Sequence, residues 1–330
     1  MTRRERIQAA VAGREVDRPP IALWRHFPEQ DVKAEKLAQA VVAFQRKFDF
    51  DLVKVTPASG YYGDDWGLKA AYRPSREGVR TYLDRPIKKP ADWGRLKSLD
   101  VTAGAHGREI HAIGLIAREL GAEAHVLQTV FSPLAIARTL CGEHALVRYV
   151  RENPEDVHRG LEIIAAVTAR FVQENLAAGA DGIFFATQCA ARGYLTEEEY
   201  ETFGRPYDLR VLEAAGNAEL ILLHVHGTDI MFDLLTDYPA HIINWHDRRT
   251  APTLAEARRR YSGCLAGGIN EYDTLSRGTP EQVKAEVKEA IVQTGSRGHL
   301  VAAGCVTLVD TPEANIRAAV EAVRMDSKER

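Results

Sequence analysis

The sequence has no run of about 18 uninterrupted apolar residues, the length that a membrane-spanning helix requires. It has only four cysteines (Cys141, Cys189, Cys264 and Cys305), scattered and without an export signal, so we expect no disulfides and a cytoplasmic location. The basic start, MTRRERIQAAVAG, lacks a following apolar run and predicts a surface helix ended by Gly13 rather than a signal peptide. Strong charge is also missing. A net charge of −3 argues against a nucleic-acid-binding or anionic-membrane surface.

Phosphate-binding loops are absent as well, because neither G-x-G-x-x-G nor G-x-x-x-x-G-K-[ST] follows the first predicted strand. What the sequence does have is eight short apolar runs, most of them separated by amphipathic helical patterns. The runs are Ile21–Trp24, Leu52–Val55, His125–Val130, Gly182–Ala186, Leu220–Val225, Ile242–Trp245, Cys264–Ile269 and His299–Ala303. Continuous apolarity indicates strands buried on both faces, and eight strand–helix units favour a (β/α)8 TIM barrel over an open sheet. We expect one domain, residues 1–330.

Amphipathic helical patterns lie between most of the apolar runs, and several begin with a recognisable N-terminal signal. The clearest are Ala34–Phe48, Glu155–Ala177, Glu197–Ala215, Leu254–Arg260, Pro280–Gln293 and Pro312–Arg324. Thr196, Thr279 and Thr311 precede acidic first turns, as N-capping residues do. Between the second and third barrel strands, residues 56–124 are too long for a simple connection, so we expect an insertion there that forms a lid or a side element.

Two histidines and a cysteine stand at the ends of predicted strands, where barrel enzymes place their active sites. His224 and His226 are two positions apart in LILLHVHG, so both side chains point to the same side of an extended strand. Cys305 ends the last strand behind Gly304, which allows the backbone to turn closely. Imidazole and thiolate donors suit zinc, so these three residues are the candidate metal ligands. A metal-free Cys–His nucleophile is the alternative.

Other polar residues also follow predicted strands. Arg25, Gln188, His246 and Asp247 are candidates for binding or protonating a substrate. Lys54 lies inside an apolar strand and needs compensation. It is either a cation of the pocket or paired with an acid on a neighbouring strand, and the pairing is the interpretation we favour here.

The chain resembles the uroporphyrinogen decarboxylase superfamily nearly end to end. The segments that carry the resemblance are Arg6–Ala10 with Asp17–Pro20, Leu23–His26, Ala178–Gly182, Leu195–Glu199, Leu223–Gly227, and Gly304–Cys305 through Thr311–Asn315. The family fold is a (β/α)8 barrel. True decarboxylases of this family need no cofactor and carry an R-Q-A-G-R motif after the first strand.

Several positions depart from the decarboxylase pattern. After Arg25 the sequence places Glu29 where the motif has a second arginine, and an anion there would repel substrate carboxylates. No aspartate follows the second strand, Ile136 lies near the position of the expected tyrosine, and Thr187 stands for the expected serine. These differences argue against porphyrinogen chemistry.

The resemblance is nearer to the zinc-dependent methyltransferases of the superfamily, which read H-x-C-G after strand five and have a cysteine after strand eight. His224 and Cys305 match, while His226 replaces a cysteine. The resemblance therefore implies zinc on His224, His226 and Cys305 and methyl transfer from a small methylated substrate to or from a corrinoid carrier or a thiol. Arg25 would anchor a substrate anion, with Gln188, His246 and Asp247 around the pocket. A separate corrinoid carrier protein and a homodimer are further expectations.

Two alternatives remain. The first is a cofactor-free decarboxylase of uroporphyrinogen or a simpler carboxylic acid. The second is a barrel that binds a tetrapyrrole or a metal without turning it over. Metal content separates the methyltransferase from the decarboxylase.

Overall fold

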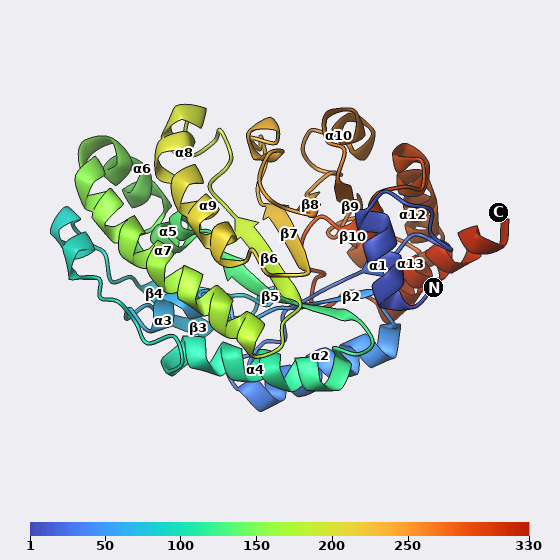
Figure 1. Cartoon of the computed structure of the whole chain (residues 1–330), viewed down its shortest axis with the longest axis horizontal. Helices are drawn as coiled ribbons and strands as arrows, with labels where there is room; N and C mark the ends of the chain where they lie inside the picture. Colours follow the sequence, from blue (N-terminus) through green and yellow to red (C-terminus); the bar gives the residue numbers. More distant parts are fainter. Residues whose placement is uncertain (330) are drawn as a thin grey trace.

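Eight parallel strands form one sheet that curls into a nearly closed barrel in the computed structural model, which describes residues 1–329 and side chains as far as residue 325 (Figure 1). The order around the barrel is β1, β10, β9, β8, β7, β6, β5 and β2. Their bounds are β1 Ile21–Ala22, β2 Leu52–Val55, β5 His125–Phe131, β6 Gly182–Thr187, β7 Leu220–Val225, β8 Ile242–Trp245, β9 Cys264–Ile269 and β10 His299–Ala303. Each strand lies on a predicted apolar run, and the predicted (β/α)8 barrel is confirmed.

The first two strands meet at a seam built around a buried aspartate. The backbone N–H of Asp51 donates to the carbonyl of Ile21 at 2.8 Å, and the Ile21 N–H donates to the Asp51 carboxylate at 2.8 Å. Arg6 and Arg18 each contact the same carboxylate at 2.7 Å. Asp51 is fully buried, so these partners supply the charge compensation that a buried carboxylate requires.

Helices cover the outside of the barrel. The main ones are α2 Ala34–Phe48, α4 Gly104–Leu120, α5 Pro133–Cys141, α6 Glu143–Glu152, α7 Pro154–Ala177, α8 Glu197–Phe203, α9 Arg205–Ala214, α10 Leu254–Arg260, α12 Pro280–Thr294 and α13 Glu313–Glu329. The prediction of one helix over Glu197–Ala215 is wrong, because the helix is interrupted at Gly204, between α8 and α9. Pro206 lies in the first turn of α9 and has no N–H to continue the hydrogen bonds of α8.

The segment between β2 and β5 contains more than a connection. The short helix α3 (Tyr61–Asp64) leads into an antiparallel hairpin of β3 (Lys69–Tyr72) and β4 (Arg80–Asp84), followed by the 3₁₀ turn η1 (Pro90–Arg95). The last part of the segment is α4, which packs its Ile113 and Ile116 with α2 and so belongs to the outer helical layer. The extra elements are therefore those before α4, and a lid role for them stays a prediction.

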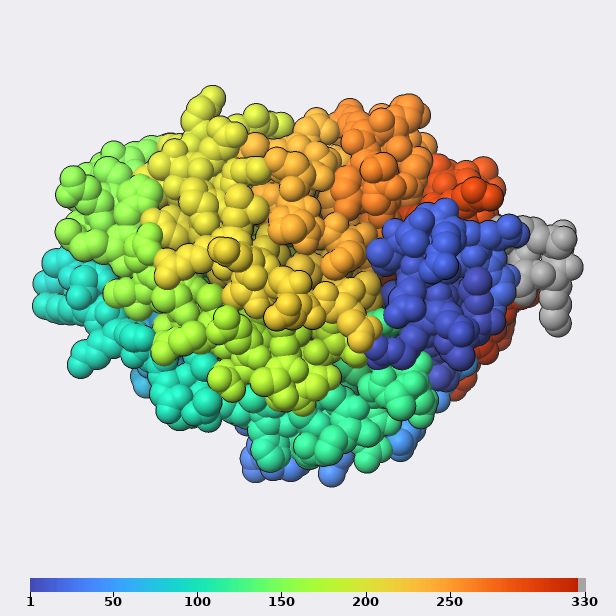
Figure 2. All heavy atoms as spheres, viewed as in Figure 1, coloured from blue at the N-terminus to red at the C-terminus, as the bar shows by residue number. Residues whose placement is uncertain are grey.

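The N-terminal helix α1 (Arg3–Val11) packs against the interior of the barrel rather than lying loose on the surface. Its Ile7 and Ala10 join a buried cluster with Leu52, Leu222 and Leu300. Figure 2 shows this segment in blue beside the helices near the end of the chain, in red. None of the helices in the described part of the chain has the length and apolarity to cross a membrane.

Candidate metal centre

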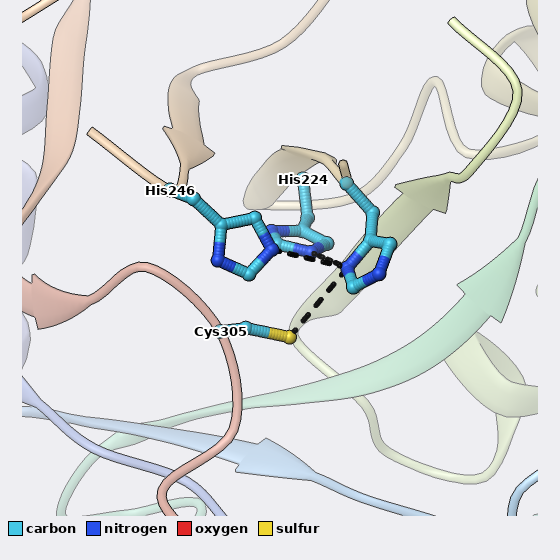
Figure 3. Close-up of side chains that lie close together, drawn as sticks. His224, His246 and Cys305 are labelled. Carbon is cyan, nitrogen blue, oxygen red and sulfur yellow. Dashed lines mark hydrogen bonds between the residues drawn. The ribbon is translucent and has the colours of Figure 1, made fainter. Parts of the chain in front are cut away.

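The structure brings four donor side chains together at the carboxyl ends of three strands. His224 is the last residue but one of β7, His226 follows that strand, His246 follows β8, and Cys305 comes two residues after β10. One ligand atom from each lies within 4.8 Å of every other in this group (Figure 3). The Nδ1 atom of His226 is 3.4 Å from His224 Nε2, 3.2 Å from His246 Nε2 and 3.8 Å from Cys305 Sγ.

Strand register explains why the fourth residue joins. β7 and β8 pair in parallel with His224 opposite Asn244, so His226 and His246 stand two positions further along their own strands. Side chains two positions apart point to the same side of the sheet. The sequence placed His246 near the pocket, and the structure places it among the candidate ligands.

Asn244 determines which nitrogen of His224 faces the cluster. The Asn244 amide donates through Nδ2 to the carbonyls of Ala266 at 3.0 Å and Ala303 at 3.1 Å. Its Oδ1 therefore faces His224 Nδ1 at 2.7 Å and accepts a hydrogen bond from it. A neutral His224 with its proton on Nδ1 presents the lone pair of Nε2 to the other three donors.

Glu271 does the same for His246. The Nδ1 atom of His246 lies 2.7 Å from Glu271 Oε1, and a carboxylate can only accept, so Nδ1 donates. Nε2 of His246 is then a lone-pair donor directed at His226. Metal-binding histidines regularly donate their second N–H to a carboxylate or carbonyl in this manner, which fixes both the tautomer and the ring orientation.

Burial favours the uncharged forms of His224, His226 and Cys305 in the absence of a cation. It lowers the pKa of His224 well below its usual range, and it lowers the pKa of His226 to about 3, with repulsion from His246 as the next cause. Burial likewise raises the pKa of the Cys305 thiol to about 11; nearby Glu271 raises it further and Lys54 opposes the shift. The lone pairs of His224 Nε2 and His246 Nε2 both point at His226 Nδ1, which carries at most one proton. A divalent cation would replace this unfavourable arrangement with favourable contacts.

Gly304 allows the thiol to come this close. A Cβ at Gly304 would lie 2.8 Å from the His246 Cα and 3.0 Å from Glu271 Oε2. Both distances are shorter than normal contacts, and one involves the backbone, so no larger residue fits without displacement. The sequence predicted this close turn of the backbone before Cys305.

Three other residues that the sequence singled out lie outside this group. Gln188 accepts a hydrogen bond of 3.0 Å from Arg138, and Arg138 is one of the cations that lower the pKa of His226. Asp247 is buried and accepts from the Gly268 N–H at 3.0 Å, so its contact is with β9. Arg25 lies over the ring of Phe27 at 5.6 Å and donates to the His26 carbonyl at 3.2 Å, and neither contact reaches the cluster.

Lys54 differs from the interpretation favoured by the sequence. Its ammonium contacts Thr56 Oγ1 at 3.2 Å and lies 4.6 Å from the centre of the Phe184 ring. Within residues 1–325 no acidic side chain pairs with it, so the predicted ion pair is wrong and Lys54 is a cation of the barrel interior. Burial lowers its pKa to about 7.

Sequence reasoning missed Asn244, Glu271 and the ligand position of His246. The available signal was the spacing of two between Asn244 and His246, which matches the spacing of His224 and His226 on the next strand. Glu271 had no such signal, because it follows β9 in a loop and only the tertiary structure brings it to His246.

The donor set fits a zinc ion. Three imidazole nitrogens and one thiolate are typical zinc ligands, and two of the imidazoles are already oriented by hydrogen bonds on their far side. With His246 included, the site offers up to four protein donors, one more than the three that the sequence predicted.

One family model and several known proteins match most of the chain. The family model for uroporphyrinogen decarboxylase (URO-D) matches residues 2–325. Uroporphyrinogen decarboxylase of Trichodesmium erythraeum is 26% identical over 248 residues, which cover 71% of this chain and 67% of that protein. The methylated-thiol–coenzyme M methyltransferase of Methanosarcina mazei is 22% identical over 350 residues, covering 98% of this chain and 89% of the relative.

Solved structures show the same fold. A methyltransferase from Methanosarcina mazei superposes with a TM-score of 0.88 at 17% identity and covers 99% of both chains. A B12-independent methionine synthase from Shewanella superposes with a TM-score of 0.60 at 13% identity, covering 94% of this chain and 97% of that one. With the family model matching almost the whole length, the chain belongs to the uroporphyrinogen decarboxylase (URO-D) family.

Proposed function

We propose that the protein is a zinc-dependent methyltransferase that moves a methyl group from a small methylated substrate to or from a corrinoid carrier or a thiol. The observation that carries this proposal is the set of four converging donors, of which two are held in the ligand tautomer by Asn244 and Glu271. The methyltransferase relative that spans nearly the whole chain supports the same branch of the family.

Zinc in this site would supply Lewis acidity, which lowers the pKa of a thiol or polarises the heteroatom that carries the methyl group. Residues around the site fix the orientation of its candidate ligands. Asn244 and Glu271 orient two imidazoles, and Phe184 stacks on His224 with ring centres 5.4 Å apart. A preorganised, largely buried site keeps water away from the reacting atoms.

The reaction balances without an external oxidant or reductant. In the direction from a methylated corrinoid to a thiol, the cobalt–carbon bond breaks and a sulfur–carbon bond forms. The cobalt keeps the electron pair of the broken bond, and the thiol proton is released. The corrinoid would be presented by a carrier protein, and a homodimer remains a further prediction.

A cofactor-free decarboxylase is the second candidate, because several curated relatives carry the name uroporphyrinogen decarboxylase. The geometry gives it less support. Arg25, the residue that would bind a substrate carboxylate, lies over Phe27 and donates to the His26 carbonyl, and neither contact reaches the donors of the cluster. Glu29 is an acid where the decarboxylase motif has a second arginine.

The first test is the metal content of protein purified without affinity tags or chelators, beside the double variant His224→Ala, Cys305→Ser. We expect about one zinc per chain in the wild type and none in the variant. Zinc-loaded protein is then mixed with methylcobalamin and a panel of thiols, and cobalamin demethylation is followed by absorbance. Failure to retain zinc even after incubation with the ion would contradict the zinc-dependent methyltransferase and make the cofactor-free decarboxylase the favoured function.

A further inference from the structure

The turn between β3 and β4 reaches past β1 to the far side of the barrel seam. This turn, residues 73–79, is named here the hairpin tip, and it belongs to the insertion that follows β2. Its Arg76 Nε donates to Asp310 Oδ2 at 2.8 Å, and the Arg76 carbonyl accepts from the backbone N–H of Val309 at 2.8 Å. The hairpin tip is therefore bonded to the loop that follows β10, which lies on the other side of β1.

The hairpin tip also contacts the loop after β9, close to the candidate metal centre. The Tyr272 hydroxyl donates to Glu77 Oε1 at 3.3 Å. Burial raises the pKa of Tyr272 to about 12, and Glu77 and Cys305 act in the same direction, so the hydroxyl is near both the hairpin tip and the thiol. Tyr272 directly follows Glu271, the carboxylate that orients His246. The two loops that the tip contacts thus carry Cys305 and Glu271.

Gly78 packs the hairpin tip tightly against these loops. A Cβ at Gly78 would lie 2.8 Å from Val309 Cγ1 and 3.0 Å from both His26 Cβ and Pro28 Cγ. The backbone φ of Gly78 is also positive, at +77°, which favours glycine. A larger residue at this position would push the hairpin tip away from the loops after β1 and β10.

The hairpin is held more firmly at its base than at its tip. At the base, Arg80 pairs with Asp64 at 3.0 Å, its side chain is 8% exposed, and its backbone N–H donates to Ser59 at 2.6 Å. At the tip, the side chains of Arg76 and Asp310 are 38% and 51% exposed. Exposed ion pairs contribute little stability, whereas breaking a buried pair is costly. The tip can therefore leave the barrel while the base stays in place.

We propose that the hairpin tip is a lid that opens and closes over the Cys305 side of the metal centre, held closed by the Arg76–Asp310 pair and by the packing of Gly78. The proposal narrows the lid expected in residues 56–124 to the turn between β3 and β4. When closed, the lid excludes water from the donors, and when open it admits a ligand. The lid does not depend on the proposed function, because it concerns only access to the thiol.

The test measures how fast N-ethylmaleimide alkylates Cys305 in the full chain after a chelator has removed any metal. Peptide mass mapping gives the rate at each cysteine. We expect Gly78→Ala to raise the rate at Cys305 about tenfold, and Asp310→Asn to raise it roughly two- to fivefold. About 1 M NaCl should speed the wild type and leave Asp310→Asn unchanged, because salt screens the exposed pair.

Two control variants match the two changes. Gly67→Ala alters another glycine of the same insertion, with φ +95° and nothing within 4 Å of the added atom. Glu162→Gln breaks an exposed ion pair with Arg210, between α7 and α9. Both should alkylate at the wild-type rate. Cys264, buried in β9, should stay unlabelled in every folded protein. If Gly78→Ala labels Cys264, that variant is unfolded and Asp310→Asn decides.

Hydrogen exchange of residues 73–79 in the same proteins shows whether the hairpin tip has moved. The proposal requires faster exchange in the tip together with faster alkylation of Cys305. Alkylation of the folded variants at the wild-type rate would overturn it, and so would faster alkylation with unchanged exchange in the tip. The zinc content of the wild type tests the proposed function separately, so either idea can fail while the other stands.

Discussion

The imidazole of His246 donates a hydrogen bond of 2.7 Å to the carboxylate of Glu271, a residue that is 1% exposed. Among the described side chains, Glu271 alone forms a hydrogen bond with Nδ1 of this histidine. The pair links the loop after β8 to the loop after β9 and sets which nitrogen of His246 faces His226. A buried carboxylate in this position makes the imidazole a stronger donor to a cation.

Glu271→Gln should therefore weaken zinc binding without removing a candidate ligand. Loss of a carboxylate behind a metal-binding histidine typically lowers affinity by about 10–100-fold. Competition with a chelating dye measures the change. Glu289→Gln, an exposed acid that pairs with Arg248, is the control and should leave the affinity unchanged. Equal affinities for the Glu271 variant and the wild type would show that His246 is not a ligand.

His226 and His246 should differ in how much each contributes to metal binding. His226 makes its contacts through Nδ1, and within the described residues no protein group bonds its other nitrogen. We expect His226→Ala to keep about one zinc per chain with reduced affinity, since three donors remain and two of them are oriented by hydrogen bonds. His246→Ala should cost more, because it also leaves Glu271 buried without its partner.

The same dye competition measures both histidine variants. His144→Ala, an exposed histidine on α6, serves as the control. The ranking is wrong if His226→Ala releases the metal while His246→Ala retains it. That result would make His226 the essential ligand and His246 a pocket residue, as the sequence alone suggested.

Gly304→Ala should disturb the centre through packing alone. The added methyl would lie 2.8 Å from the Cα of His246, and the backbone there cannot move cheaply. We expect a loss of about 1–3 kcal/mol in the free energy of unfolding, together with weaker zinc binding. Urea denaturation of the metal-free protein measures the first effect. Gly193→Ala, where nothing lies within 4 Å of the added atom, is the control. Unchanged stability and zinc affinity would mean that the loop has room to relax.

Asp208 should make the protein less stable as the pH rises from about 4 to about 7. Burial raises the pKa of Asp208 to about 7, although Tyr200 and Tyr238 donate hydrogen bonds to it at 2.6 and 3.1 Å. In the unfolded chain an aspartate has a pKa of about 3.9. Between these values the folded protein holds a proton that the unfolded chain has lost, so stability falls as the pH rises and then levels off above about 7.

Asp208→Asn should remove this contribution. Compared with the wild type, the variant should lose less stability between pH 4.5 and pH 7.5, by on the order of 2 kcal/mol. Urea unfolding at the two pH values measures the difference, and Glu213→Gln on the exposed side of α9 is the control. If the wild type and the Asn variant change in parallel, the carboxyl is not protonated in the folded protein.

Local sequence patterns determined most of the fold of this protein. The eight apolar runs predicted the eight barrel strands because strands buried on both faces must be continuously apolar. The spacing of His224 and His226 also predicted their shared side, since residues two apart in a strand point the same way. Helix starts at threonine were predicted equally well, with Thr196 and Thr279 both capping helices in the structure. The helical period of Glu197–Ala215 does not reveal the break at Gly204, because Pro206 interrupts the hydrogen bonds of the helix without changing the spacing of its apolar residues.

Tertiary structure alone decided the final composition of the site. Cys305 lies 79 positions from His226 in the chain, and only closure of the barrel brings its sulfur to 3.8 Å from that imidazole. His246 joins because β7 and β8 pair with His224 opposite Asn244, a register that the sequence does not specify. The interaction partners of Glu271, Lys54 and Arg25 could not be predicted from the sequence either. A charged side chain's partners depend on which strands are neighbours and which way each residue faces, so electrostatic compensation follows from the three-dimensional arrangement and not from local pattern.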